Sequence, residues 1–365
     1  MILIDIIAGA RPNFMKVAPI IKAIKKSQRN GGSLTFRLVH TGQHYDPKLS
    51  GSFFEQLNIP QPDINLDVGS GTQAEQTGAI MIKYEKLLVD EPSQLCIVVG
   101  DVTSTMACAI SAQKMGVPVA HVEAGIRSGD WTMPEEINRM VTDSITNYFF
   151  TTSTTANENL INANVKKENI FFVGNTMIDT LLANLDRLKP PSFWNDLKLV
   201  SGEYLILTLH RPSNVDSIKK FKDLLFAVGK FSHELPIIFP VHPRTAKTLL
   251  NIKDLPENLH MVDPQPYLEF NYLVKNAKAV ITDSGGVTEE ATVLGVPCMT
   301  LRDSTERPET VTVGTNRLIG TDPSALEPAL NNLFAGKWQK GDIPDNWDGK
   351  TAERIVLILE KLLCQ

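Results

Sequence analysis

Short apolar runs alternate with helical patterns along the whole chain, and this alternation most strongly limits the folds open to it. The expected strands of the first half are 2–7, 36–40, 95–99, 117–121, 147–151 and 170–173. Those of the second half are 204–208, 237–240, 260–262, 279–282 and 297–300. Nearly continuous apolar strands separated by helices are typical of parallel sheets covered on both faces. We therefore predict an α/β protein.

The length of the chain indicates two domains. A chain of 365 residues is too long for one ordinary core and suits two domains of roughly 150 to 190 residues. The best boundary is near Pro190-Pro191, where a helix that starts after Asn175 meets a Pro-Pro break. We expect Rossmann-like domains at 1–188 and 189–350, with a central cleft, and a last helix at 351–365 that packs back on the first domain.

Composition and charge exclude several classes of protein. Lysine plus arginine total 36 and aspartate plus glutamate 41, and no basic stripe of the kind that binds nucleic acid is present. The four cysteines are far apart and lack metal-ligand spacing. The N-terminus lacks the pattern of a signal peptide, and no apolar run is long enough to span a membrane. We expect a cytoplasmic protein without a metal site.

The strongest local signal is a strand, a small-residue turn and a helix at 279–291. Ser284, Gly285 and Gly286 form the turn. Backbone N–H groups and the positive end of a helix dipole make such a turn an anion site, and glycine lets a phosphate approach closely. A plain helix N-cap at Asp283 or Ser284 is the alternative. Glu290, further along the helix, is either an acceptor for ribose hydroxyls or a solvated residue.

The first strand also ends in a loop that suits a ligand. Arg11 and Lys16 follow this strand at the start of the next helix, where open α/β sheets bind ligands beyond the carboxyl ends of their strands. The loop lacks the glycine pattern of a dinucleotide site, so NAD is not implied. A purely structural loop is the alternative.

Three carboxylates fall at the ligand-facing edge of the first predicted domain. Asp101 and Glu123 follow strands, and Glu135 opens a helix on which Arg139 lies four residues later. Taken singly, each is more often structural than catalytic. Taken together, crowded carboxylates raise one another's pKa, which lets one act as a general acid and another as a base.

In the second domain, His210 and His242 each follow a strand. Two histidines at equivalent strand ends favour phosphate contact or acid catalysis, whereas a lone histidine is more often a hydrogen-bonded structural group. Arg302 and Arg307 lie in a charged loop and pair either with phosphate or with neighbouring acids.

These motifs occur in an order that resembles the non-hydrolysing UDP-N-acetylglucosamine 2-epimerase family. The likeness covers almost the whole chain and rests on GARPNFMKVAPI, GDVTST, HVEAGIRS, MPEEINR, LHRPSN, PVHPR, TDSGGVTEEA and TERPE. It implies a glycosyltransferase-type-B fold that closes over a UDP-sugar without a cofactor. It also implies interconversion of UDP-GlcNAc and UDP-ManNAc by elimination and readdition of UDP through a 2-acetamidoglucal, for bacterial surface polysaccharide precursors.

The resemblance also assigns roles to residues. It makes Asp101, Glu123 and Glu135 catalytic carboxylates and His210 a candidate acid beside the departing diphosphate. The positions it assigns to substrate binding are Arg11, Lys16, Arg139, His242, Ser284, Gly285, Gly286, Glu290 and Arg307. Gln43 and His44 match a region where many bacterial members bind an activating second UDP-GlcNAc, but Asp46 and Gly69-Ser70-Gly71 depart from that pattern. We further expect a homodimer.

Several alternatives stay open. Asn13 stands where an acidic residue is usual, and His210-Arg211-Pro212-Ser213-Asn214 is less basic than the common run. Relatives act on other UDP-sugars, including a 2,3-diacetamido glucuronate, and the sequence does not fix the substituents at C3 and C6. A hydrolysing epimerase that releases UDP and ManNAc, a glycosyltransferase and a UDP-sugar-binding regulator are the other candidates.

Overall fold

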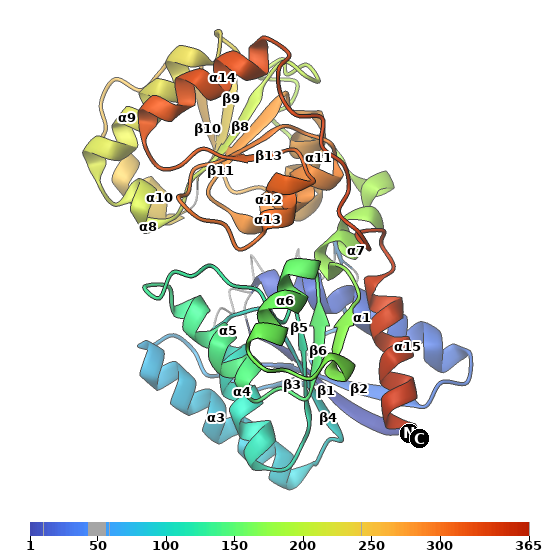
Figure 1. Ribbon diagram of the computed structural model, residues 1–365. Helices are drawn as coiled ribbons and strands as arrows, with labels where there is room; N and C mark the ends of the chain where they lie inside the picture. The colour runs from blue at the N-terminus through green and yellow to red at the C-terminus, as the bar shows by residue number, and fades with distance from the viewer. Residues whose placement is uncertain (10, 43–55, 58, 242, 365) are drawn as a thin grey trace. The chain divides into compact units, whose positions relative to one another are not determined.

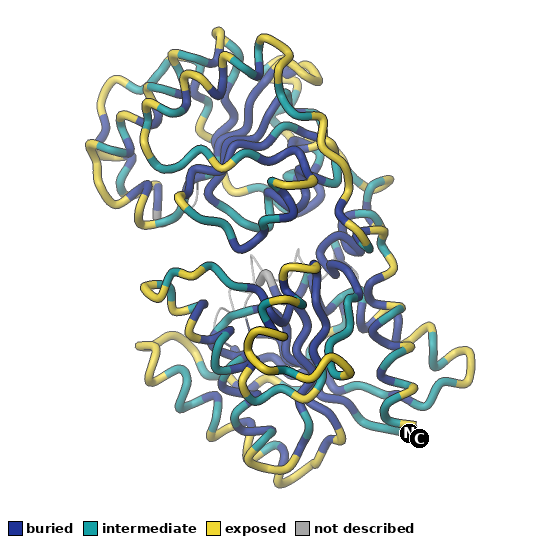
Figure 2. Tube along the Cα trace, viewed as in Figure 1, coloured by how far each residue is buried: buried dark blue, intermediate teal, exposed yellow. Residues whose placement is uncertain are grey.

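The computed structural model describes residues 1–9, 11–42, 56–57, 59–241 and 243–364, and of residues 11, 12, 243 and 244 it describes only the backbone. The chain divides into two compact units, Met1–Ala183 with Asp345–Gln365, and Asn184–Pro344. Each is an α/β unit whose strands are buried and whose helices expose their outer faces (Figure 1, Figure 2). No helix of the described residues is long and apolar enough to cross a membrane.

In the first unit, the described strands form one parallel sheet in the order β3-β2-β1-β4-β5-β6-β7. Its strands are β1 Ile2–Ala8, β2 Leu34–His40, β3 Ile64–Asn65, β4 Leu95–Val99, β5 Val119–Val122, β6 Tyr148–Thr151 and β7 Ile170–Phe172. The helices are α1 Arg11–Arg29, α3 Gln73–Asp90, α4 Thr103–Lys114, α5 Pro134–Ser144, α6 Thr154–Asn162, α7 Thr176–Leu182 and α15 Thr351–Leu363. A short 3₁₀ helix, Lys167–Asn169, also belongs to this unit, and a second one, Leu185–Arg187, lies at the start of the second unit.

Two groups of helices cover this sheet. Helices α1, α7 and α15 contact one another, and α3, α4 and α5 form a second group. Cys96 and Val98 of β4 pack into the core that α3 and α4 complete. Because alternate residues of a strand point to opposite faces, a strand covered on both sides is apolar throughout, as Leu95–Val99 is. This pattern is the reason that the strands could be predicted.

The second unit repeats the arrangement with the strand order β10-β9-β8-β11-β12-β13, again parallel among the described strands. The strands are β8 Leu205–Thr208, β9 Ile237–Pro240, β10 Leu259–Val262, β11 Ala279–Thr282, β12 Cys298–Thr300 and β13 Asn316–Leu318. The helices are α8 Pro212–Val215, α9 Ile218–Phe231, α10 Pro243–Leu249, α11 Tyr267–Asn276, α12 Gly285–Val293, α13 Pro308–Thr312 and α14 Leu326–Phe334, with a 3₁₀ turn at Pro323–Ala325.

In both sheets, the order of the strands reverses at one point while the strands stay parallel. The first strand of each unit lies between the second strand and the strand that follows the third, so that β1 neighbours β4 and β8 neighbours β11. Helices on either side leave a crevice at the carboxyl ends of the strands at such a switch point, and ligands of doubly wound folds bind there. In each unit, a ligand site is therefore expected among the residues just after these two strands.

The last helix belongs to the first unit. Trp347 lies between α14 and α15 in the sequence. It is fully buried, and its indole N–H donates to the carbonyl of Thr152 at 3.1 Å. Asp179 of α7 then accepts from the backbone N–H groups of Thr351 (3.1 Å) and Ala352 (2.7 Å), which begin α15. Ile355, Val356 and Leu359 bury the inner face of this helix.

Candidate functional site

The carboxyl ends of β1 and β4 approach each other closely in the first unit. Asn13 of α1 accepts from the N–H of Gly9 (3.1 Å) and donates to the carbonyl of Val99 (2.9 Å). Only a side chain with both an acceptor and a donor makes this bridge, which gives a physical role to the Asn that replaces an acid. Gly100 follows with a φ of +70°, a conformation that favours glycine.

Glu123 sits at the same edge and is held in an unusual backbone conformation. Its φ is +71°, in the left-handed region that non-glycine residues rarely occupy. Its side chain is buried and forms an ion pair with Lys16 of α1. A side chain at position 100 would lie 3.1 Å from Nζ of Lys16 and 3.4 Å from Oε2 of Glu123. The Lys16–Glu123 pair therefore lies directly against the Gly100 turn, next to Asp101.

Asp101 contacts a second cation. Nη2 of Arg139 donates to its Oδ2 at 2.6 Å and Nε at 3.1 Å, and Asn138 donates to its backbone carbonyl at 2.8 Å. These contacts tie the first turns of α5 to the end of β4. Asp101, Glu123, Lys16 and Arg139 are thus gathered at one switch point, and Glu135 lies half-buried in the first turn of α5.

Arg139 uses a different glutamate from the one that its spacing suggested. The sequence placed Glu135 and Arg139 on one helical face, but Arg139 pairs with Glu136 at 2.6 Å, three residues before it. Glu136 also accepts from the N–H groups of Ser128 and Gly129, both at 3.0 Å. Burial opposes its ionisation, but these backbone hydrogen bonds and Arg139 outweigh that effect and lower its pKa.

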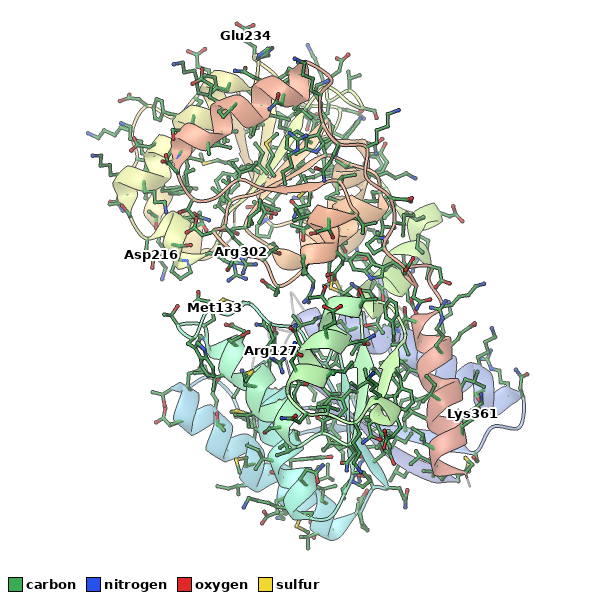
Figure 3. All side chains as sticks on the ribbon, in the orientation of Figure 1. Arg127, Met133, Asp216, Glu234, Arg302 and Lys361 are labelled. Atoms are coloured by element: carbon green, nitrogen blue, oxygen red, sulfur yellow. The ribbon has the colours of Figure 1, made fainter. Side chains whose placement is uncertain are left out.

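A buried network that sequence reasoning missed supports the loop between β5 and α5. Nδ1 of His121 lies 2.7 Å from Oδ1 of Asp143, which accepts from it, and Nε2 lies 2.9 Å from the carbonyl oxygen of Gly100. Asp143 also binds Arg127 at 2.6 Å and the N–H of Gly125 at 3.1 Å. Figure 3 labels Arg127 and Met133, which both belong to this loop. Burial opposes ionisation of Asp143, but His121 and Arg127 outweigh it and lower its pKa.

In the second unit, the predicted anion site has the expected backbone. Helix α12 begins at Gly285 with Ser284 at the N-cap position, and the Ser284 side chain makes no capping hydrogen bond. Ser284, Gly285 and Gly286 are half-buried, and the backbone N–H of Ser284 donates to Oγ1 of Thr282 at 3.0 Å. The first-turn N–H groups of a helix attract anions. The Ser284 side chain thus does not cap the helix, and a phosphate site at this turn stays a prediction.

Asp283 does not cap this helix either. Its carboxylate is wholly buried and binds the loop after β8, where it accepts from the backbone N–H groups of His210 and Arg211 and from the side chain of Asn214. Nδ1 of His210 lies 2.8 Å from Oδ1 of Asp283. Burial opposes ionisation of Asp283, but the contacts with His210, Arg211 and Asn214 outweigh it and lower the pKa. The sequence had suggested only a cap.

Glu290 lies on the second turn of α12 and is buried. Its Oε1 accepts from Asn271 of α11 at 3.3 Å, and Tyr267 lies beside it. Burial raises its pKa from the usual 4.5 to about 7, and the charge of neighbouring Glu289 adds to the rise. The alternative of a solvated helix residue is therefore wrong, because only 4% of the residue is exposed.

Arginines and carboxylates alternate around this turn. Arg307 forms an ion pair with the buried Glu289, and Arg302, labelled in Figure 3, pairs with Glu306 at 2.7 Å. A side chain at Gly285 would lie 3.2 Å from Oε1 of Glu306, so this carboxylate lies close to the turn. The two arginines of the charged loop thus contact acids of their own unit.

Some predicted positions lie outside the described residues. These are Gln43, His44 and His242. Arg11 is described only as the first residue of α1. Within the described part of the chain, no three His, Cys, Asp or Glu side chains are grouped so as to hold a metal ion.

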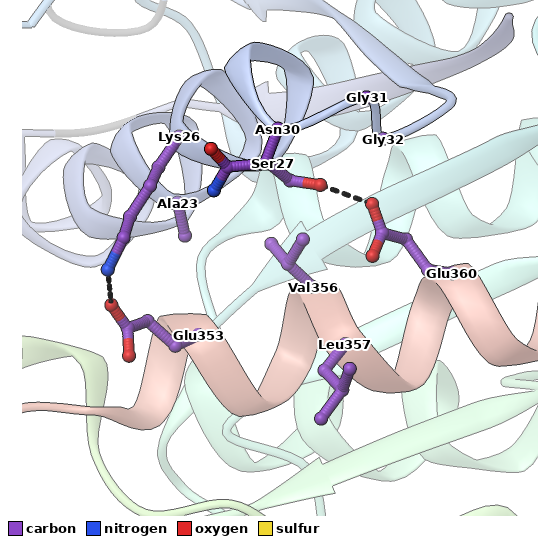
Figure 4. A pocket seen from close by; sticks show the side chains of 10 residues that line it. All are labelled: Ala23, Lys26, Ser27, Asn30, Gly31, Gly32, Glu353, Val356, Leu357 and Glu360. Carbon is purple, nitrogen blue, oxygen red and sulfur yellow. Dashed lines mark hydrogen bonds and ion pairs between the residues drawn. The ribbon is translucent and has the colours of Figure 1, made fainter.

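A separate groove in the first unit has none of these residues in its lining. It lies between α1 and α15, measures about 470 Å³ and is crossed by the pairs Lys26–Glu353 and Ser27–Glu360 (Figure 4). Lys26 and Glu353 are more than half exposed. The groove is a feature of how the last helix packs and is distinct from the switch-point residues.

Comparisons with known proteins agree on one family. The family model described as UDP-N-acetylglucosamine 2-epimerase matches residues 25–360. The UDP-N-acetylglucosamine 2-epimerase of Methanocaldococcus jannaschii is 42% identical, with 98% of each chain covered. The crystal structure of that enzyme in complex with UDP-GlcNAc and UDP has a TM-score of 0.89, with 41% identity over 99% of this chain and 100% of that one. A UDP-2,3-diacetamido-2,3-dideoxy-D-glucuronate 2-epimerase of Pseudomonas aeruginosa is 37% identical, with 98% of this chain and 99% of that one covered. The two Rossmann-like units are those of the glycosyltransferase-type-B fold, and the chain belongs to the UDP-N-acetylglucosamine 2-epimerase family.

Proposed function

We propose that this protein interconverts UDP-N-acetylglucosamine and UDP-N-acetylmannosamine. The observation that carries the proposal is the pair of switch points. One presents the carboxylates Asp101 and Glu123 with cations beside them, and the other presents an uncapped helix N-terminus next to a histidine. Base chemistry and diphosphate binding are the two requirements of an elimination that expels UDP.

The proposed reaction proceeds by elimination and readdition. A carboxylate removes the proton at C2 of the sugar, its electrons form the C1–C2 double bond, and the C1–O bond breaks with its electrons on the β-phosphate oxygen. The products are UDP and 2-acetamidoglucal. A proton then adds to C2 from the opposite face, and the UDP oxygen bonds again to C1. No atom is gained or lost, so the reaction is an isomerisation.

The second unit is assigned the nucleotide. The N–H groups of the turn at Ser284–Gly286 bind the diphosphate, Glu290 accepts from the ribose hydroxyls, and Arg307 stabilises negative charge. His210 is assigned the proton that the departing diphosphate receives. Arg11 and His242 are proposed as further contacts to UDP-sugar, on the family resemblance alone.

The first unit is assigned the sugar. Glu123 and Asp101 each form an ion pair, with Lys16 and Arg139 respectively, that holds the carboxylate in place. The left-handed backbone of Glu123 carries a cost of roughly 1–3 kcal/mol, and such costs are characteristic of residues whose direction matters to function. Glu135 lies where the helix α5 begins and is assigned the proton at the other face of C2. Arg139 and Lys16 hold the two carboxylates.

We infer that the enzyme does not hydrolyse its substrate, because the 42%-identical relative is named as a 2-epimerase and its structure holds UDP-GlcNAc and UDP. A 2-epimerase of a diacetamido glucuronate derivative is the second candidate, and the 37% identity with the Pseudomonas enzyme favours it. Its chemistry at C1 and C2 is the same. In a cell the product would serve the synthesis of surface polysaccharide.

The deciding experiment is an NMR assay of UDP-sugars in deuterium oxide. UDP-GlcNAc is expected to give UDP-ManNAc with deuterium at C2, without accumulation of free UDP. UDP release in step with turnover would instead show a hydrolysing enzyme, and deuterium in only the diacetamido glucuronate derivative would favour the second candidate. A folded protein that exchanges no C2 hydrogen in any of these sugars would refute the epimerase.

The variant Glu123→Gln tests the base. Activity is expected to fall by about 10²-fold to 10⁴-fold, the usual contribution of acid–base catalysis. Glu353→Gln is the matched control, since Glu353 lies exposed in the same unit on α15 and outside the switch point. Unchanged deuterium exchange in Glu123→Gln would show that a different residue is the base.

We also propose that the protein forms a homodimer through α3. Ile82 and Val89 are seven residues apart on this helix and remain 73% and 63% exposed. Exposed apolar side chains on one face of a helix favour packing against a partner. The double variant Ile82→Glu with Val89→Glu is expected to convert a dimer to a monomer in light scattering, and a monomeric unmodified chain would contradict the proposal.

A further inference from the structure

We propose that Asp283 is a positioning residue that fixes the tautomer of His210 and thereby directs Nε2, rather than Nδ1, toward the diphosphate. The inference rests on the proposed function in assigning a diphosphate to the turn at Ser284–Gly286. Asp283 immediately precedes that turn. The same segment would then both bind the departing group and orient the acid that protonates it.

The sheet brings the two residues together. Strands β8 and β11 are parallel neighbours with Thr208 opposite Thr282, and the two threonine hydroxyls are 2.6 Å apart. The N–H of Asp283 donates to the carbonyl of Thr208 at 3.2 Å. His210 is therefore two residues beyond the end of one strand and Asp283 one residue beyond the end of the other. Their meeting is a consequence of strand register.

The contacts of the Asp283 carboxylate show which ring nitrogen of His210 donates a hydrogen bond to it. Oδ1 lies 2.8 Å from Nδ1 of His210, while Oδ2 accepts from the backbone N–H of Arg211 at 2.9 Å and from Asn214 at 3.1 Å. The carboxyl group has no exposed surface, and these donors lower its pKa. An ionised carboxylate only accepts hydrogen bonds. Nδ1 of His210 must therefore carry the hydrogen, which leaves Nε2 for the ligand.

Asp283 does not need the His210 side chain in order to hold the loop after β8 in place. The backbone N–H groups of His210 and Arg211 and the side chain of Asn214 already tie the loop to Asp283. The side chain of His210 has 43% of its surface exposed, and its Nδ1 lies 2.8 Å from Oδ1 of Asp283. This contact favours one orientation of the imidazole.

The chemistry follows from this orientation. When the C1–O bond breaks, the imidazolium gives its Nε2 proton to the β-phosphate oxygen and becomes the neutral Nδ1–H tautomer, still bound to Asp283. On readdition, Nε2 takes the proton back as that oxygen bonds to C1. A buried carboxylate that holds imidazole in this way stabilises the charged form and the correct tautomer without accepting the proton itself.

The tautomer can be read without any substrate. In the full chain labelled with ¹⁵N-histidine, long-range ¹H–¹⁵N spectra distinguish the two neutral tautomers, and loss of one set of signals in His210→Asn assigns His210. We expect the Nδ1–H form in the unmodified protein. A predominant Nε2–H form there would overturn the proposal, and this result needs no variant of Asp283 to fold.

Two variants then separate the orientation of His210 from the stability of the loop. In Asp283→Asn, the amide can donate to Nδ1, so the tautomer is expected to switch to Nε2–H and kcat to fall by about 10²-fold or more, within the usual range of acid–base catalysis, while UDP affinity changes less than about threefold. Asn214→Ala removes a donor to the other carboxylate oxygen and should lower stability but keep the Nδ1–H tautomer. An unchanged tautomer in Asp283→Asn would contradict the proposal.

A double-mutant cycle completes the test. If Asp283 acts through His210, the double variant Asp283→Asn with His210→Asn should be as slow as His210→Asn alone, within about twofold. A further large loss in the double variant would show a structural role. If no UDP-sugar is epimerised at all, the proposed function fails, yet the tautomer still tests the Asp283–His210 pair.

Discussion

Glu290 is buried, and its carboxyl group has a pKa near neutrality. Its pKa of about 7 arises because burial penalises the ionised form more than Asn271 and Tyr267 stabilise it. Near neutral pH the carboxyl group is therefore divided between its two forms. A ribose, whose hydroxyls donate hydrogen bonds, favours the ionised form.

The affinity for UDP is therefore expected to rise with pH. If only ionised Glu290 accepts from the ribose, the dissociation constant falls about tenfold between pH 6 and pH 8, as the ionised fraction grows. Calorimetric titration of UDP measures this. Glu290→Gln is the control, because it keeps the titration of the phosphate itself but loses the carboxylate. Parallel pH profiles for the two proteins would contradict the role of Glu290.

The same group makes the fold less stable as the pH rises. The folded-state pKa lies above the unfolded value of 4.5, so the group's stabilising contribution is complete below pH 4.5 and is lost as the pH rises through 7. Glu290→Gln is expected to increase the free energy of unfolding by about 1–3 kcal/mol at pH 8 relative to its effect at pH 5. Urea titrations at the two pH values measure this, and an effect independent of pH would refute it.

At this scale, residue types were easier to predict than their partners. The turn at Ser284–Gly286, Glu123 and His210 were predicted as site residues because they follow strands. The pairing of Arg139 with Glu136 rather than Glu135, and of Asp283 with His210 rather than with its own helix, depended on contacts between distant segments. Spacing along the chain carries no information about such contacts. They follow from strand register and from the bend of the loop at 128–129.

At the scale of elements, α15 depends on a residue far away in sequence. Lys350 occupies its N-cap position without a side-chain capping bond, and Asp179 of α7 supplies the acceptor instead. The carboxylate also lies at the positive end of the helix dipole, which is favourable. The Asp179 side chain thus joins α15 to α7.

Asp179→Ala is expected to lower the free energy of unfolding by about 0.5–2 kcal/mol, the usual cost of a lost N-cap. Glu353→Gln is the control on the same helix. It breaks only the exposed Lys26–Glu353 pair, for which the expected cost is about 0–1 kcal/mol. If urea titrations show the same loss in the free energy of unfolding for both variants, Asp179 stabilises α15 no more than an exposed ion pair does.

The predicted elements agree with the structure where the apolar runs are long. The strands at 95–99, 237–240 and 279–282 match β4, β9 and β11 to the residue. Strands β3 and β13 were missed, because Ile64–Asn65 and Asn316–Leu318 are too short to show a pattern and lie at sheet edges. The division after Ala183 rather than at 188 likewise reflects contacts, which a Pro-Pro break marks only approximately.

At the scale of the molecule, the first unit is discontinuous in sequence. It consists of 1–183 and 345–365, and the second unit is inserted between them. Trp347, Ile355 and Leu359 from the last segment are buried in the first unit. Burial of large side chains contributes about 1.5–3 kcal/mol each relative to exposure, and their loss leaves an uncovered surface on α1 and α7.

Removal of residues 345–365 is therefore expected to unfold the first unit and leave the second one folded. Hydrogen exchange of the truncated chain should show loss of protection in β1, β4 and α1 but not in β8, β11 and α12. Trp347→Ala, which keeps the chain length, should weaken the same unit by about 3–5 kcal/mol. Retained protection throughout the truncated chain would contradict this dependence.

The inserted arrangement has a consequence for how the protein matures during translation. The ribosome releases the second unit while the first one still lacks α15, which follows the second unit in the chain. The second unit can fold as it emerges, whereas the first becomes complete only after α15 has left the exit tunnel. A prematurely terminated chain therefore exposes the apolar surface of α1 and α7, and chaperones and proteases can distinguish it from the finished enzyme by that surface.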